Sequence, residues 1–91
     1  MAKELNFTQN SQGKWESSFV ASGDRIGAHI KRDKPGPFIA YGSIEDVEAT
    51  ILHDFGPSAQ DNLMFEIDVP ADVNVTFVSY TEVTAAKITG V

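Results

Sequence analysis

The sequence predicts an all-β protein: a single small β-sandwich, immunoglobulin-like or jelly-roll-like, of about seven or eight short antiparallel strands. Three observations predict this class. Apolar residues recur with period two in short runs, turn residues separate these runs at intervals of about 8 to 12 residues, and helical periodicity is nearly absent. A chain of 91 residues can bury one hydrophobic core, so we expect one domain over residues 1–91.

The strand that begins at Arg25 has the clearest alternation. Ile26, Ala28 and Ile30 share one face, whereas Lys31 and its polar neighbours lie on the other. The same period predicts the other strands, which we place at residues 5–7, 15–21, 38–44, 47–55, 63–69, 73–77 and 83–88. In the strand over 47–55 the alternation directs Ile51, His53 and Phe55 toward the core.

Turn residues separate the predicted strands. The polar, glycine-containing and proline-containing segments 9–13, 22–24, 43–48, 56–62 and 70–72 have the composition of loops and turns. Pro35 and Gly36 are expected to form a type II turn, in which Gly36 adopts positive φ. Within the strands, Ile30, Phe65, Ile67 and Val75 are predicted to lie in the core because each belongs to an alternating apolar run.

Charge and composition exclude several classes of function. Acidic residues outnumber basic ones by 13 to 7, and this surface repels phosphate backbones, so we expect no nucleic-acid partner. There is no cysteine, which excludes disulfides, thiolate nucleophiles and the common structural zinc sites. Residues 1–6 lack the apolar run of a secretory signal, and no stretch approaches the roughly 20 apolar residues of a membrane span. We therefore expect no membrane association.

Catalytic and metal-binding patterns are scarce, and we expect a protein that is not an enzyme and has no cofactor and no metal. His53 and Asp54 are the one candidate acid–base pair, but consecutive strand residues point to opposite faces, which favours a packed or edge histidine beside a solvated aspartate. Glu45, Asp46 and Glu48 form the densest acidic group. They lack the alternation and glycine of a calcium loop, which favours a solvated acidic turn.

Aromatic side chains provide a candidate glycan-binding platform. Sugars stack on exposed rings, and Trp15, Tyr41 and Tyr80 are the candidates in this chain. The alternative interpretation is that these rings are needed for the core, with their polar atoms at the surface.

The basic residues are concentrated in one short region. Four of the seven lie within ten residues, at Arg25, Lys31, Arg32 and Lys34, whereas residues 35–86 contain nine acidic residues and no Lys or Arg. One interpretation is a solvated hairpin that only keeps the chain soluble. The other is a contact patch for an acidic protein surface, including that of a second copy of the chain.

A cysteine-free, compact all-β chain with polar termini resembles the small β-sandwich auxiliary or decoration proteins of bacteriophage capsids, and similar chains occur as immunoglobulin-like modules of bacterial surface proteins. The resemblance implies a non-enzymatic protein-interaction module in a phage virion or other large assembly, with the capsid or further copies as partners. It also implies a location in the virion or the cytoplasm. The alternative function is a carbohydrate-binding or adhesive module.

Overall fold

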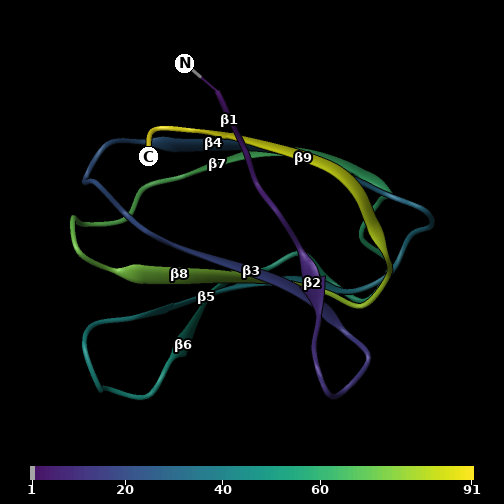
Figure 1. The fold of residues 1–91 in the computed structure, drawn as a ribbon, viewed down its shortest axis with the longest axis horizontal. Coiled ribbons are helices and arrows are strands. Elements are labelled where there is room, and N and C mark those ends of the chain that lie inside the picture. Colours follow the sequence, from purple (N-terminus) through teal and green to yellow (C-terminus); the bar gives the residue numbers. More distant parts are fainter. Residues whose placement is uncertain (1) are drawn as a thin grey trace.

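Residues 2–91, which the computed structural model describes, form nine β-strands in two packed antiparallel sheets (Figure 1). The strands are β1 (Lys3–Glu4), β2 (Thr8–Gln9), β3 (Trp15–Val20), β4 (Ile26–Arg32), β5 (Phe38–Ser43), β6 (Thr50–Asp54), β7 (Asn62–Ile67), β8 (Asn74–Ser79) and β9 (Val83–Thr89). Sheet A has the order β1-β9-β4-β7 and sheet B the order β2-β3-β8-β5-β6. The predicted β-sandwich is confirmed. None of residues 2–91 forms a helix that could cross a membrane.

Sheet A is centred on β4, the strand with the clearest alternation. Ala28 of β4 pairs with Phe65 of β7 on one side and with Ile88 of β9 on the other. This register places Ile26, Ala28 and Ile30 on the face that meets sheet B, where all three are buried. The period of two in the sequence thus corresponds to a strand with one face in the core and the other toward solvent.

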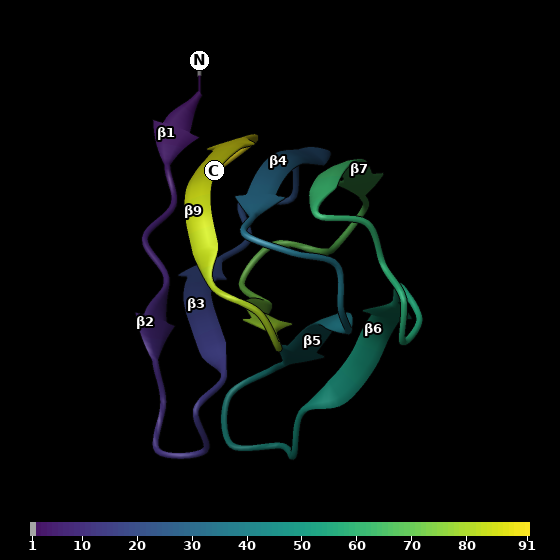
Figure 2. The ribbon, with the colours of Figure 1, turned by 90° about the vertical axis from the view of Figure 1, so that its right-hand side faces the viewer.

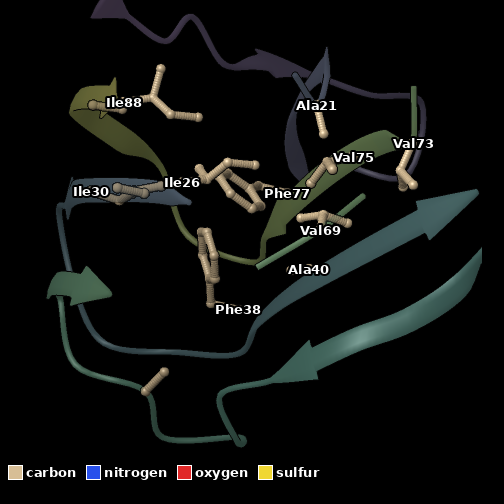
Figure 3. Close-up of a cluster of buried hydrophobic side chains, with 13 residues drawn as sticks. Ala21, Ile26, Ile30, Phe38, Ala40, Val69, Val73, Val75, Phe77 and Ile88 are labelled. Atoms are coloured by element: carbon tan, nitrogen blue, oxygen red, sulfur yellow. The ribbon is translucent and has the colours of Figure 1, made fainter. Parts of the chain in front are cut away.

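The core lies between the two sheets (Figure 3). Ile26 and Ile30 of sheet A face Phe38, Val75 and Phe77 of sheet B, and all five side chains are inaccessible to solvent. The phenylalanine rings meet edge-on or tilted, and the centroids of Phe38 and Phe77 lie 5.7 Å apart.

Two of the four predicted core residues lie deep in this core and two lie at its margin. Ile30 and Val75 are fully buried, as predicted. Phe65 and Ile67 are half-buried and pack against the core from β7, which is an edge strand of sheet A. An edge strand has a neighbour on one side only, so its inward side chains keep part of their surface in contact with water.

The predicted first strand over residues 5–7 is wrong. Two short strands of two residues each flank this segment instead, β1 at the edge of sheet A and β2 at the edge of sheet B. The chain crosses between the sheets at Leu5 and Phe7, whose side chains pack against the core. Figure 2 shows this arm along one side of the sandwich, with β6 and β7 at the opposite side.

The expected positive φ at Gly36 is also wrong, because Gly36 lies outside the left-handed region. The prediction assumed a hairpin, but β4 belongs to sheet A and β5 to sheet B, so the connection crosses the end of the sandwich. The Gly36 amide donates to the carbonyl of Ala59 (3.0 Å), and the Thr81 hydroxyl donates to the carbonyl of Lys34 (2.9 Å). Tertiary hydrogen bonds therefore determine the shape of this connection.

Candidate functional site

The four basic residues predicted to bind a partner do not form one patch. Arg25 precedes β4 and forms ion pairs with Asp68 (3.1 Å) and Glu66 (3.4 Å). The hydrogen bond and the charge of Asp68, together with the charge of Glu66, raise the pKa of Arg25. These exposed carboxylates therefore already balance the charge of Arg25.

Lys31 and Lys34 lie at the other end of β4 and are exposed. A strand rises about 3.3 Å per residue, which places Lys31 roughly 20 Å from Arg25 along β4. Two exposed acidic residues lie at the same end, since Asp33 follows Arg32 in the chain and its amide is bonded to the carbonyl of Glu82 (3.0 Å). The charge segregation of the sequence thus becomes a mixed surface in the fold.

The expectation that Arg32 is exposed is wrong, because only 1% of this residue is accessible to solvent. Its Nη1 donates hydrogen bonds to the Pro37 carbonyl (3.1 Å) and the Ser79 hydroxyl (3.2 Å). Its Nη2 donates to the carbonyls of Ala59 (2.9 Å) and Gln60 (2.7 Å). Arg32 therefore joins connections within the fold instead of contacting a partner.

Arg32 is buried and forms no ion pair within residues 2–91, and both facts affect its pKa. Loss of water lowers its pKa, and the nearby charges of Asp61 and Asp33 oppose this effect. The guanidinium carbon lies 5.5 Å from the centroid of the Phe38 ring, a distance at which a cation is attracted to the ring face. Nε has no hydrogen-bond partner within residues 2–91. The period of β4 contains a signal for this burial, since position 32 continues the inward series 26, 28 and 30.

The structure does not bring the three candidate sugar-binding rings together on one face. Trp15 pairs with Ser79, and Phe38 pairs with Ser79 from the other side, so Trp15 lies on the inward face of sheet B. Tyr41 comes three residues after Phe38 and therefore lies on the outward face. Tyr80 is exposed, and its hydroxyl accepts a hydrogen bond from Lys14 (3.1 Å).

The histidines lie in different sheets, and His53 and Asp54 do not form an acid–base pair, in line with the favoured interpretation of an edge histidine beside a solvated aspartate. His29 of β4 is exposed and bonds to the side-chain oxygen of Asn62 (2.7 Å). His53 pairs with Ala40 and so lies on the inward side of sheet B as predicted, but it is exposed, like all five residues of edge strand β6, and is not part of the core. Asp54 accepts a hydrogen bond from the amide of Gly56 (2.9 Å). In residues 2–91 no three His, Asp or Glu side chains are grouped so that they could hold a metal ion.

Strand β6 is the most unusual surface element of the described chain. It forms one edge of sheet B, with β5 as its only hydrogen-bonded neighbour among residues 2–91. An edge strand directs part of its backbone N–H and C=O groups outward, where another strand can bind. The surface that sequence reasoning missed is therefore a free strand edge.

Apolar side chains gather at β6 and the loop before it. Val47 is 68% exposed, Ile51 is 52% exposed and Leu52 is 39% exposed, and Ile44 is also exposed. Leu52 lies at a β-bulge. The register runs from the Ala40–His53 pair to the Tyr41–Ile51 pair, which leaves Leu52 as the additional, unpaired residue of β6.

Leu52 covers Gly42 of β5 at an end of the sandwich. A Cβ atom at Gly42 would lie 2.9 Å from Leu52 Cδ1, so the absence of a side chain makes room for Leu52. Next to it is a groove of about 360 Å³. Its walls come from the ends of β5 and β6, the 44–48 loop and the segment between β7 and β8 (Val69, Pro70 and Val73). Figure 1 shows these two loops at the same end of the sandwich.

Carboxylates flank this apolar surface. Glu45, Asp46 and Glu48 are all exposed in the loop before β6. None of them takes part in an ion pair among residues 2–91. The acidic turn of the sequence thus borders an apolar groove and a free strand edge. We refer to Ile44, Val47, Ile51, Leu52 and these three carboxylates as the β6 surface.

A second hollow, of about 410 Å³, lies on the outer face of sheet A over Gly27. Met64, Glu66 and Lys87 line its sides. Both signs of charge border this hollow, whereas carboxylates alone flank the β6 surface.

Comparison with known proteins finds no match for this chain among family models, curated proteins or solved structures.

Proposed function

We propose that this chain is a non-enzymatic protein-interaction module, a structural component of a larger assembly, and that it binds its partner through the β6 surface. The observation that carries this proposal is the exposure of all five residues of β6 at a free sheet edge. Contiguous exposed apolar residues bordered by charges are typical of protein-binding sites.

The arrangement of the titratable side chains favours binding over catalysis. A histidine base needs a partner that orients it, but the Asp54 carboxylate is bonded to the Gly56 amide (2.9 Å). The ring of His53 instead lies edge-on to the ring of Phe55, with centroids 4.4 Å apart. This contact gives His53 a packing role.

The finer part of the proposal is that the assembly is a virion. It rests on the resemblance of the sequence to capsid decoration proteins, which makes a capsid shell the first partner class to test. In that setting a free edge strand gives each copy an attachment site on a neighbouring subunit.

Site-specific photo-crosslinking tests the binding surface. A photoreactive amino acid replaces Ile51 in the chain expressed from its own locus, and the matched control replaces Met64, which is 76% exposed on edge strand β7. We expect one discrete adduct from position 51, and mass spectrometry of the adduct identifies the partner. No adduct at position 51, or equal adducts at positions 51 and 64, would contradict the proposal.

A further inference from the structure

The edge strands of the two sheets differ in how well they resist pairing with another chain. β1 and β2 have two residues each. β7 carries Glu66, which pairs with Arg25. Short length and charged side chains are the usual protection of an edge. β6 has five residues, none of them Lys or Pro, and it presents Ile51 and Leu52; its one acidic residue, Asp54, is the last of the strand and accepts a hydrogen bond from the Gly56 amide. It is therefore the edge most open to an added strand.

The groove at the end of β6 supplies a place for a side chain of that strand. Leu52 and Val47 line the groove together with Val69 and Val73, which are both buried. In strand addition, main-chain hydrogen bonds bind the segment, and pockets for alternate side chains select its sequence. The apolar lining selects an apolar residue.

The charges beside the groove determine which charged residues the added strand would carry. Asp46 and Glu48 are exposed beside the groove, and residues 35–86 contain no Lys or Arg that could pair with them. A second copy would bring the same carboxylates to a β6–β6 contact, because a two-fold interface presents identical patches. The β6 surface of a second copy contains no Lys or Arg that could pair with these carboxylates, so a basic segment complements this surface better than a second copy does.

We propose that β6 accepts an extended segment of a protein partner, with alternating apolar and basic residues, as a sixth strand of sheet B. The inference rests on the proposed function and specifies the chemistry of the partner. The apolar residues of the segment face the groove beside Leu52, and its Lys or Arg residues face Asp46 and Glu48.

A peptide titration followed by NMR tests this inference. The probe is an acetylated, amidated eight-residue peptide of alternating Lys and Val, added to the ¹⁵N-labelled chain. We expect saturable shifts at residues 44–54, at least about tenfold weaker binding in high salt, and no binding of the corresponding Glu–Val peptide. An N-methylated Lys–Val peptide, which cannot donate strand hydrogen bonds, should also fail to bind. Shifts centred on β7, no saturable binding, or equal binding of the Glu–Val peptide would overturn the inference.

Matched charge variants separate the charge of the β6 surface from the net charge. Asp46→Lys with Glu48→Lys should weaken Lys–Val binding at least tenfold. The control, Asp24→Lys with Glu82→Lys, changes the net charge equally at exposed positions elsewhere and should retain the affinity. Equal losses in both variants would overturn the inference.

The crosslink at position 51 distinguishes a failure of the proposed function from a failure of the basic-strand inference. If no adduct forms, the proposed function fails. If an adduct forms but the Lys–Val peptide does not compete with it, or if the partner is a second copy of the chain, only the basic-strand inference fails.

Discussion

At the level of single residues, Arg32 is the largest fully buried side chain of residues 2–91. Its guanidinium joins the β4–β5 connection at Pro37, the β6–β7 loop at Ala59 and Gln60, and the end of β8 at Ser79. Backbone carbonyls that lose a donor inside the protein remain desolvated and unpaired, which is unfavourable. One side chain therefore stabilises two connections and the end of a strand.

Replacing Arg32 should strongly destabilise the fold. Arg32→Ala is expected to lower the free energy of unfolding by about 3 kcal/mol, because it removes four hydrogen bonds and leaves a cavity. Arg32→Lys should lose less, since lysine keeps the charge without the planar fork. Urea titration measures both, with Lys31→Ala, at an exposed position, as the control within about 0.5 kcal/mol. Equal effects of Lys31→Ala and Arg32→Ala would contradict the structural role.

Gly36 is required for close packing. A Cβ atom there would lie 2.9 Å from Thr81 Cγ2, and the Thr81 hydroxyl is held by its bond to Lys34. Gly36→Ala should therefore destabilise by about 1 to 3 kcal/mol. Thr81→Ser removes the clashing methyl group and keeps the hydroxyl, so adding it should recover part of that loss in a double-mutant cycle. Strict additivity of the two changes would show that the contact is not the cause.

At the level of elements, β7 shows how an edge strand contributes to the core. Its alternate residues point inward and outward, so that Phe65 packs on Phe38, Phe55 and Phe77 whereas Met64 is exposed. The closest of these contacts joins the Phe55 and Phe65 ring centroids at 4.6 Å. Phe65 thus links the end of β6 to the core through Phe55.

Truncating Phe65 and its neighbour Met64 should change the free energy of unfolding by very different amounts. Phe65→Ala is expected to cost about 3 kcal/mol, at the low end for phenylalanine because the ring is half-buried. Met64→Ala should change the free energy of unfolding by less than about 0.5 kcal/mol. Chemical denaturation of both variants measures the difference, and similar losses would show that the assigned faces of β7 are wrong.

At the level of the whole molecule, most strand pairing is distant in sequence. β3 pairs with β8 and β4 pairs with β9, whereas few consecutive strands form hairpins. Closing these long loops before contacts form makes folding slow. The sandwich is therefore expected to form cooperatively, with neither sheet stable alone.

Refolding kinetics test this expectation. After dilution from urea, we expect one main phase on the millisecond-to-second timescale. Fluorescence of Trp15, the single tryptophan, reports on sheet B, and far-UV circular dichroism reports on both sheets. The two signals should change together. A faster microsecond phase in one of them would indicate that part of the sandwich forms independently.

Much of the fold follows from period-two patterning in the sequence. The strands predicted from residues 15–21, 38–44 and 63–69 match β3, β5 and β7 closely. Their side chains alternate between core and solvent, and this alternation is a local property of the extended chain. The sequence also showed the acidic turn at 45–48, but not what borders it.

Tertiary structure alone decided where the sheet edges lie and what each connection does. A period of two assigned Ile51 and His53 to the core. It does not show the bulge at Leu52, which leaves Ile51 paired with the outward residue Tyr41, or the edge position of β6, which leaves His53 exposed. Arg32 continues the inward series of β4, and hydrogen bonds to Pro37, Ser79 and the β6–β7 loop compensate for its burial. Gly36 does not form the expected type II turn, because β4 and β5 belong to different sheets. The sequence by itself determined which residues alternate, whereas neighbours distant in the chain determined which faces are covered.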